Sequence, residues 1–288
     1  MRVLRGAKAL VTGAANGIGR AIALRLAREG TSLYLLDIDD HGLAAVVKQA
    51  EQSGVAAIGR CCDISSAEEI SQANAAMLDC WGQLDVLVNN AGVCFYGPTL
   101  DMTDEQWRRL LAINLLAPVQ FVRELAPVLL SRPESHILNV ASMYGLVATN
   151  RCSAYHLSKF GLVGFSEALR AEYARRGLGV TALCPGFVAT ELFQSMPNEA
   201  PGRIPRTPPR WVCTTPERVA DKAVRAIRRN TRVALVTPLA HAVYYARRIA
   251  PGLLDMLYHI GSHRRPGRIG ESTQAHPNTL PCPKQRAA

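Results

Sequence analysis

Residues 8–19 read KALVTGAANGIG and join a short apolar run to a turn that contains Gly13, Gly17 and Gly19. The run is typical of a buried strand, and the residues from about 17 to 29 carry apolar side chains with helical spacing. Glycines at a strand–helix turn allow the backbone to approach a pyrophosphate, whose charge the helix N-terminus then stabilises. A turn of this kind also serves simply to pack a helix close to a strand, so the rest of the chain has to decide.

Apolar strand-like runs alternate with segments of helical periodicity as far as residue 238. Strands that are apolar on both faces suit a parallel sheet covered by helices. The sequence therefore predicts an α/β fold in a single domain: a doubly wound, Rossmann-like, seven-stranded parallel sheet with helices on both faces. The predicted strands are 8–13, 31–38, 55–64, 84–92, 136–142, 179–186 and 232–238, and the predicted helices are about 17–29, 42–52, from 66 onward, 103–130, 152–176 and 215–230.

Two of the predicted helices carry start signals in the sequence. Ser66 and Glu69 form a capping-box pattern, in which each side chain bonds to the backbone N–H of the other residue. Thr215 stands at an N-cap position and is followed by Pro216 at the first helical position.

The composition is that of an ordinary globular protein, since 48% of the 288 residues are hydrophobic and 19% are charged. No uninterrupted apolar run of about 18 residues predicts a membrane-spanning helix. The N-terminus leads directly into the first strand without a separate apolar leader, so we expect a cytoplasmic protein. The eight cysteines include no C-x-x-C pair and no Cys/His cluster with zinc spacing, so we expect reduced thiols and no metal site.

The net charge of +10 is unevenly distributed along the chain. Residues 201–288 contain 16 Lys and Arg against 4 Asp and Glu, a balance of +12, which leaves −2 for residues 1–200. A basic segment can meet anionic lipid or nucleic acid, but it is more often a solvated face or tail. No RNA- or DNA-binding motif accompanies these basic residues, so we expect no nucleic-acid partner.

Tyr155 and Lys159 lie four residues apart within SAYHLSKFG (153–161), so a helix would place both side chains on one face. A positive charge beside a phenol stabilises the ionised phenol, and the pair is therefore a candidate proton-transfer device. The alternative to a proton-transfer role is simple packing of the tyrosine ring on the aliphatic part of the lysine side chain.

Asp37 ends the second predicted strand, 18 residues beyond Gly19. A carboxylate at this place can accept hydrogen bonds from the ribose hydroxyls of a bound dinucleotide. Because the acid occurs jointly with the glycine turn, cofactor binding is favoured over a purely structural turn.

Five motifs in order along the chain resemble those of the short-chain dehydrogenase/reductase family, and the resemblance covers about residues 5–240. It implies an NAD(P)-dependent oxidoreductase that acts on CH–OH groups. The motifs are TGAANGIG (12–19), NNAG (89–92), Asn114, Ser142 with the Tyr155–Lys159 pair, and PGFVAT (185–190).

The resemblance implies a role for each catalytic residue. Tyr155 is the acid/base on the substrate oxygen, and Ser142 forms a hydrogen bond to that oxygen. Lys159 holds the nicotinamide ribose and lowers the pKa of the tyrosine. Asn114 bends its helix and holds a water that links Lys159 to solvent. The cofactor-binding residues that the resemblance implies are Gly13, Asn16, Gly17, Ile18, Gly19, Asp37, Asp63, Ile64, Asn90, Gly92, Tyr155, Lys159, Pro185, Gly186, Val188 and Thr190, with Thr12 tying the turn.

The residues around Asp37 predict that NAD(H) is favoured over NADP(H). A carboxylate repels the 2′-phosphate of NADP(H), whereas an Arg or Lys accommodates it. Asp37 is followed by Ile38, and the residue before the second glycine is Asn16 rather than a basic residue.

Apolar and aromatic residues are predicted to form the substrate pocket, which suits a small apolar alcohol or ketone. We therefore expect an NAD(H)-dependent oxidoreductase that interconverts a lipophilic secondary alcohol, of steroid, retinoid or terpenoid type, and its ketone. The alternatives are a 3-oxoacyl-thioester reductase of the same family and a non-catalytic dinucleotide-binding regulatory protein. For each pocket residue the alternative is a place in the core or in an oligomer contact. These residues are Cys94, Phe95, Tyr96, Met143, Tyr144, Phe187, Leu192, Phe193, Met196 and Trp211.

The remaining expectations concern the C-terminal part and the assembly. The catalytic domain is predicted over 1–238, with a substrate loop at about 190–214, a helical extension over 239–263 and a disordered tail over 264–288. Residues 238–260 predict an amphipathic helix broken near Pro251, which packs on the body or on a partner subunit, with peripheral membrane contact as the alternative. The resemblance implies a homodimer or homotetramer.

Overall fold

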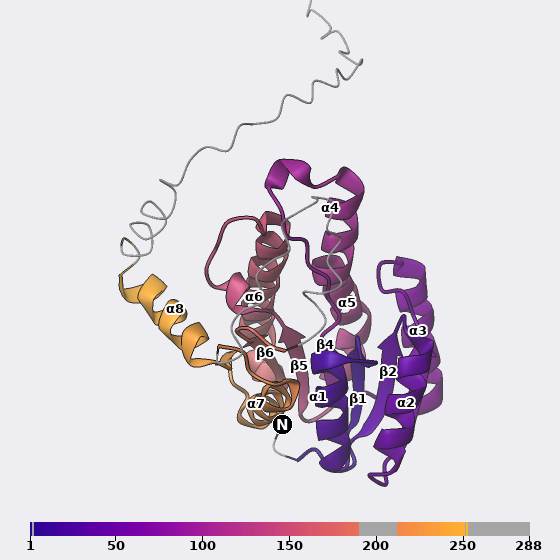
Figure 1. Ribbon diagram of the computed structural model, residues 1–288. Coiled ribbons are helices and arrows are strands. Elements are labelled where there is room, and N and C mark those ends of the chain that lie inside the picture. Colours follow the sequence, from indigo (N-terminus) through magenta and orange to yellow (C-terminus); the bar gives the residue numbers. More distant parts are fainter. Residues whose placement is uncertain (2, 190–211, 251, 253–288) are drawn as a thin grey trace, which may run out of the picture.

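The fold is built on a parallel β-sheet with helices on both of its faces (Figure 1). The computed structural model describes residues 1, 3–189, 212–250 and 252. The strands in this part of the chain are β1 (Lys8–Thr12), β2 (Ser32–Asp37), β3 (Ala57–Cys61), β4 (Val86–Asn89), β5 (Ser135–Val140), β6 (Leu178–Cys184) and β7 (Val233–Leu235). They form a seven-stranded sheet in the order β3-β2-β1-β4-β5-β6-β7, with every described pairing parallel. The predicted sheet is confirmed.

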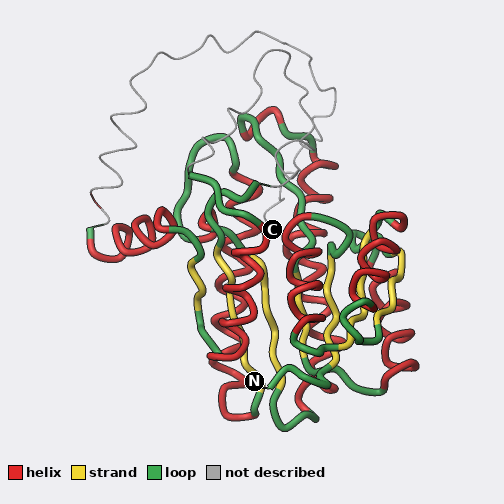
Figure 2. Tube along the Cα trace, turned by 60° about the horizontal axis from the view of Figure 1, so that its bottom comes forward, coloured by secondary structure: helices red, strands yellow, loops and turns green. Residues whose placement is uncertain are grey.

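Two layers of helices cover the sheet, one on each face, and bury the strands from β2 to β6 in its interior, whereas the edge strand β3 stays partly exposed (Figure 2). The helices are α1 (Gly17–Arg28), α2 (Asp40–Glu51), α3 (Ala67–Trp81), α4 (Asp104–Leu111), α5 (Ala117–Leu130), α6 (Ser153–Tyr173), α7 (Pro216–Arg229) and α8 (Pro238–Ile249). One core cluster joins the sheet to α1, α2 and α7, and it includes Ile22 and Val219. The other joins the opposite face to α3, α5 and α6, and it includes Phe121 and Leu169. This arrangement confirms the doubly wound fold.

The strand order reverses at β1, which lies between β2 and β4. In open α/β sheets a ligand crevice forms at such a point, beside the carboxyl ends of the strands. β1 ends at Thr12 and β4 ends at Asn89. The fold therefore brings the glycine-rich turn (12–19) and the NNAG sequence (89–92) to the same place.

The predicted capping residues start their helices, with one difference. The hydroxyl of Ser66 accepts a hydrogen bond from the N–H of Glu69, and Thr215 caps α7 in the same way. The Glu69 carboxylate, however, accepts from the N–H of Asp63 rather than from that of Ser66. The capping box predicted at Ser66 is therefore half formed, because the preceding loop presents its own donor to Glu69.

The continuous helical stretch Asp104–Leu130 is, by length and composition, apolar enough to cross a membrane. Its residues Phe121, Leu125 and Leu129 are fully buried against the sheet. A core helix passes the same test, so packing within the fold accounts for the apolar composition of this stretch.

Several predictions fall on residues that the structure does not describe. The substrate loop predicted over 190–214 is described only from residue 212, and the predicted tail 264–288 lies outside the described residues. Of the helix predicted over 238–260, α8 accounts for the residues up to Ile249. The predicted domain boundaries therefore remain predictions.

Candidate active site

The turn after β1 requires glycine at two positions where a side chain would meet backbone. Gly13 has a φ of +64°, and a Cβ atom there would lie 2.8 Å from the Cα atom of Ala91. A Cβ atom at Gly19 would lie 1.9 Å from the carbonyl oxygen of Gly13. The N-cap residue of α1, Asn16, makes no side-chain capping bond. The first N–H groups of α1 can therefore bind an anion that approaches the turn.

Hydrogen bonds tie this turn to the residues after β4. The Thr12 hydroxyl accepts from the N–H groups of Asn90 and Ala91, at 3.0 and 3.1 Å. The Asn90 amide in turn donates to the carbonyl oxygens of Thr12 and Gly13, at 3.0 Å each. Thr12 therefore ties the turn as predicted, and Asn90 holds both walls of the crevice together.

A cleft of about 380 Å³ runs along the turn and across the ends of β1, β2 and β4. Gly19 was predicted to bind cofactor, but it lies behind the turn, against Gly13 and the Asn90 side chain, and acts there by close packing. The predicted cofactor residues that line the cleft are Gly13, Asn16, Gly17, Ile18, Asp37, Asp63, Ile64, Asn90, Gly92, Tyr155 and Lys159. The lining residues that sequence reasoning did not assign to the site are Leu36, Ile38, Cys62, Ala91, Val93, Arg109, Ile113, Val140 and Ala141.

Asp37 is held rigidly at the end of β2. Its Oδ2 atom accepts a hydrogen bond from the N–H of Ala15 at 2.8 Å, and its Oδ1 atom accepts from the N–H of Asp39 at 3.0 Å. The next residue, Ile38, is 61% exposed and offers no positive charge. The rim of the cleft therefore carries a fixed negative charge at this point.

Asp63 lies in the cleft with a partner from α4. Its Oδ1 atom accepts from the N–H of Ser65 at 2.9 Å, and its Oδ2 atom lies 3.9 Å from Nη2 of Arg109. Partial burial opposes ionisation, but the bonds from Ser65 and the charge of Arg109 lower the pKa of the Asp63 carboxyl. No motif marks Arg109, because its place in the cleft depends on how α4 packs beside the loop after β3.

Tyr155 and Lys159 lie on one face of α6, and both side chains are buried. The Nζ atom of Lys159 donates to the carbonyl oxygen of Val140 at 2.9 Å and lies 5.6 Å from the centroid of the Tyr155 ring. Ser142 lies beside Tyr155 in the wall of one small cavity. The structure therefore brings together the three side chains that the sequence predicted, Ser142 from the turn after β5 and the other two from α6.

The pKa of the Tyr155 phenol differs in direction from the sequence-based expectation. Burial raises the pKa of this phenol, and the nearby Ser142 hydroxyl only partly opposes that effect. Burial also lowers the pKa of Lys159 to about 8. The net shift of the tyrosine pKa is therefore upward because of removal from water, and the lowering contribution expected from Lys159 stays a prediction. The phenol is consequently protonated at neutral pH.

Asn114 is fully buried in a π-helical turn, Ala112–Leu116, between α4 and α5. Its Oδ1 atom accepts from the N–H of Val93, and its Nδ2 atom donates to the carbonyl oxygen of Val93, at 2.8 Å each. A Cβ atom on Gly92 would lie 3.3 Å from Asn114 Oδ1 and 3.5 Å from Lys159 Nζ. Asn114 thus reaches the surroundings of Lys159, and the irregular helix agrees with the predicted bend.

A small cavity of about 50 Å³ adjoins the cleft at Tyr155. The predicted pocket residues Met143, Tyr144 and Phe187 line this cavity, which makes its wall largely apolar. The predicted cofactor residues Pro185, Gly186 and Val188 also lie here, together with Ile18, Ala141 and Ser142. The reacting oxygen of a substrate would therefore meet Tyr155 and Ser142 beside apolar surface.

The loop after β4 supplies a second wall next to Tyr155. Cys94 and Cys152 pack with Tyr155 in one buried cluster, with Tyr96 against it. Cys152 was not predicted; it stands three residues before Tyr155, a helical spacing that places it on the same side of α6. Phe95, which was predicted as a pocket residue, instead packs with Met102, Trp107 and Leu110 against the start of α6, because its side chain points to the opposite side of the loop. The predicted site residues that lie outside the described residues are Thr190, Leu192, Phe193, Met196 and Trp211.

The chain is similar in sequence to known proteins of one family. Residues 7–201 match the family model described as short chain dehydrogenase. A Streptomyces coelicolor protein named "Putative ketoacyl reductase" is 40% identical over 190 residues, which cover 65% of this chain and 73% of that protein. "Granaticin polyketide synthase putative ketoacyl reductase 1" of Streptomyces violaceoruber is 38% identical over 188 residues, 65% of this chain and 69% of that protein.

Solved structures match the fold over most of the chain. A short chain dehydrogenase/reductase from Burkholderia phymatum in complex with NAD has a TM-score of 0.79 at 28% identity, over 88% of this chain and 97% of that one. Actinorhodin polyketide ketoreductase, solved as a variant with NADPH, has a TM-score of 0.73 at 32% identity, over 82% of this chain and 98% of that one.

Replacing Gly19 by Ala tests the glycine turn. The added Cβ atom would meet the Gly13 carbonyl oxygen at 1.9 Å, so the turn must move. We expect Gly19→Ala to weaken NADH binding by about tenfold or more, because displaced N–H groups bind the phosphates less well. NADH titration by fluorescence, with circular dichroism to verify folding, measures the effect. Gly164→Ala on α6, where nothing lies within 4 Å of the new Cβ atom, is the control. Equal dissociation constants for both variants would contradict this role.

Proposed function

The chain belongs to the short chain dehydrogenase family, and we propose that it reduces an apolar ketone, in particular the 3-oxo group of an acyl chain, with a nicotinamide cofactor. The observation that carries this proposal is the position of Tyr155. Its side chain lines both the dinucleotide-sized cleft and the small apolar cavity, and Ser142 lines that cavity beside it. A reacting carbonyl at this junction would meet a proton donor on one side and cofactor on the other.

The residues of the cleft fit a dinucleotide. The glycine turn leaves no room for a Cβ atom at Gly13, and it points the start of α1 at the cleft, as phosphate binding requires. The Asp37 carboxylate suits the adenosine ribose, and Asp63 suits the adenine amino group. A bound nicotinamide would supply the hydride that the chain's own side chains cannot.

The catalytic side chains would act on the substrate oxygen. Negative charge develops on a carbonyl oxygen during reduction, and Tyr155 would donate its phenolic proton there. Burial raises the pKa of Tyr155, so the proton is present at neutral pH. The Ser142 hydroxyl would donate a second hydrogen bond to the substrate oxygen. Lys159, which donates to the Val140 carbonyl, would supply positive charge beside the phenol. Asn114 holds the backbone at Val93 in place beside this group.

The relatives support a 3-oxoacyl substrate. Two Streptomyces relatives carry names that refer to ketoacyl reduction, and a solved neighbour is a polyketide ketoreductase. An apolar wall formed by Met143, Tyr144 and Phe187 suits the chain beside the ketone. A ketone within an acyl chain therefore fits the apolar wall of the site and also agrees with the names of the relatives. The lipophilic secondary alcohol that the sequence alone favoured agrees with the site only.

Asp37 supports NAD(H) as the preferred cofactor. Its charge is fixed by two backbone N–H groups, so it cannot swing away from a 2′-phosphate. Neighbouring structures include one with NAD and others with NADP or NADPH, so the family accommodates both.

A second candidate is the NAD(H)-dependent oxidation of a lipophilic secondary alcohol, and Asp37 is the observation that favours it. The same side chains would act in reverse, with Tyr155 as the base. The intact Tyr155, Lys159 and Ser142 group disfavours a purely regulatory dinucleotide-binding role. A cytoplasmic homodimer or homotetramer stays a prediction from the sequence.

Tyr155→Phe should lower turnover by about 10²–10⁴-fold, because it removes the positioned proton donor. NADH binding should change little, since the glycine turn and Asp37 hold most of the dinucleotide. Steady-state kinetics and an NADH titration measure the two effects. Tyr144→Phe is the matched control, because it removes a phenol hydroxyl from the neighbouring ring, which packs edge-on against that of Tyr155 at 6.3 Å. A Tyr155→Phe enzyme that keeps more than half of the turnover would refute the mechanism.

A substrate panel separates the two candidate functions. We expect the highest kcat/KM for 3-oxoacyl thioesters, ahead of steroid and terpenoid ketones of similar apolar area. Each substrate is assayed with NADH and NADPH, and the corresponding alcohols with NAD⁺ and NADP⁺. A preference of about tenfold for the cyclic substrates, worth roughly 1.4 kcal/mol in transition-state binding, would favour the second candidate instead.

Asp37→Asn combined with Ile38→Arg should shift the kcat/KM ratio of NADPH to NADH upward by at least about tenfold. The amide can still accept the Ala15 N–H, while the carboxylate that repels the phosphate is gone and a guanidinium is added. Asp40→Asn, which removes one charge at the start of the next helix, is the control. A wild-type enzyme that already prefers NADPH would show that Asp37 does not set the preference.

A further inference from the structure

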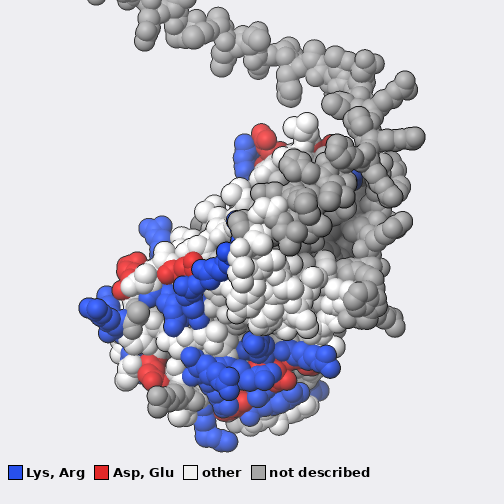
Figure 3. Space-filling view, turned by 90° about the vertical axis from the view of Figure 1, so that its left-hand side faces the viewer, with Lys and Arg blue, Asp and Glu red and all other residues white. Residues whose placement is uncertain are grey.

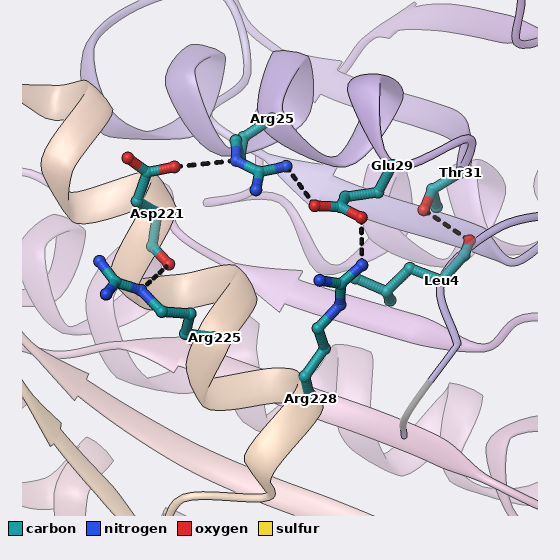
Figure 4. A network of polar contacts seen from close by, with 7 residues as sticks. All are labelled: Leu4, Arg25, Glu29, Thr31, Asp221, Arg225 and Arg228. Carbon is teal, nitrogen blue, oxygen red and sulfur yellow. Dashed lines mark hydrogen bonds and ion pairs between the residues drawn. The ribbon is translucent and has the colours of Figure 1, made fainter.

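Helix α7 has two charged faces, and the described residues neutralise the charge of one of them. On the first face, the Asp221 carboxylate accepts from Nε of Arg25 on α1 at 2.8 Å (Figure 4). Arg25 also pairs with Glu29, and Glu29 pairs in turn with Arg228 of α7. Two positive and two negative side chains therefore balance where α7 packs on α1.

The second face carries Lys222, Arg225 and Arg229, which lie at positions i, i+3 and i+7 of α7 and so share one side of the helix. Among the described residues, no carboxylate lies within ion-pairing distance of these three side chains. Arg225 donates only to the backbone oxygen of Asp221 (Figure 4). Like charges at this spacing destabilise a helix slightly. A contribution to the stability of the fold therefore does not explain why three cations lie on this side of α7.

These cations line a groove of about 460 Å³ between α7, β7 and α8. Arg232 adds a fourth cation, shared with Glu167 at 3.5 Å, and His241, Tyr244 and Tyr245 of α8 form the opposite wall. No acidic residue is among the described residues that line this groove. Figure 3 views the side of the molecule that carries α8 and shows Lys and Arg side chains gathered there, with a smaller number of Asp and Glu among them.

Helix α8 presents apolar side chains beside this groove. Leu239, Tyr245 and Ile249 are 37%, 54% and 79% exposed. Ala242, Tyr245, Ala246 and Ile249 follow the spacing i, i+3, i+4 and i+7 of one helical stripe. Tyr245 belongs both to the stripe and to the groove, so the apolar stripe and the cations adjoin. The opposite side of α8 holds the helix on the body, where Ala240 is fully buried.

We propose that the basic groove and the exposed stripe of α8, here called the α7–α8 surface, dock the protein on an anionic phospholipid membrane. An interfacial helix binds by inserting an apolar stripe while flanking cations meet lipid phosphates, and the α7–α8 surface has both parts side by side. A second copy of the chain is disfavoured as the occupant, because a symmetric contact would bring the unpaired cations of both copies together. This inference goes beyond the proposed reaction and does not depend on it.

Docking would place the membrane next to the catalytic loop. Arg247 of α8 donates to the carbonyl oxygen of Leu146 and stacks on the Phe160 ring of α6, with 4.8 Å from guanidinium to ring centroid. Leu146 follows the short helical turn that begins after Ser142. A lipid-bound α8 is therefore in direct contact with the segment that carries an active-site hydroxyl.

Vesicle flotation of the full chain tests the proposal. We expect the protein to float with vesicles of phosphatidylcholine containing phosphatidylglycerol, not with phosphatidylcholine alone, and to be released at high salt. Lys222→Gln, Arg225→Gln and Arg229→Gln together should weaken binding by roughly 100-fold, since each cation near an anionic leaflet contributes about fivefold. Lys48→Gln, Arg108→Gln and Arg123→Gln together remove the same charge from exposed positions elsewhere, and this control should bind like the wild type.

A second variant tests the apolar part. Tyr245→Ser with Ile249→Ser should weaken vesicle binding at low salt, where the charges remain intact, and NADH binding should verify that each variant is folded. Absence of wild-type flotation, or equal losses in the two triple variants, would overturn the proposal. So would concentration-dependent self-association, measured by sedimentation velocity, that the α7 triple variant or the α8 variant abolishes, because the surface would then bind a second copy.

Discussion

The close approach of the glycine-rich turn to the end of β4 is the constraint on which the rest of the site depends. A side chain at position 19 would clash with the Gly13 carbonyl oxygen, and a side chain at position 13 would clash with the backbone of Ala91. The turn therefore brings the N-terminus of α1 to the point where the strand order reverses. Thr12 and Asn90 fix this approach with hydrogen bonds between β1 and the loop after β4. The cleft exists because these two chain segments meet there.

Burial decides the chemistry of the groups that line the cleft. Removal from water raises the pKa of Tyr155 and lowers that of Lys159 to about 8, so both groups are held nearer to their neutral forms. A buried ammonium group is costly unless it is hydrogen-bonded, and the Val140 carbonyl accepts from Lys159. Nearby, Asn114 satisfies both backbone groups of Val93.

Helix α7 connects the core of the sheet to the surface proposed to meet lipid. Its buried side carries Val219 and Ile227 in the core, and its charged flank toward α1 is balanced by Arg25 and Glu29. The remaining flank, with Lys222 and its neighbours, meets no carboxylate among the described residues that line its groove. This flank lies beside α8, the helix that contacts the loop after Ser142.

Local patterns in the sequence were sufficient for the parallel sheet, the glycine turn and the Tyr155–Lys159 pair, because each depends on residues close together in the chain: strands apolar on both faces, glycines at one turn, and a spacing of four on one helix. Tertiary structure alone decided the partners that come from distant segments. Val140 binds Lys159, Arg109 faces Asp63, Phe95 turns away from Tyr155, and the Glu69 carboxylate binds the N–H of Asp63 instead of that of Ser66. The direction of the Tyr155 pKa shift belongs here too, because desolvation depends on everything packed around a side chain and has no signature in the residues next to it.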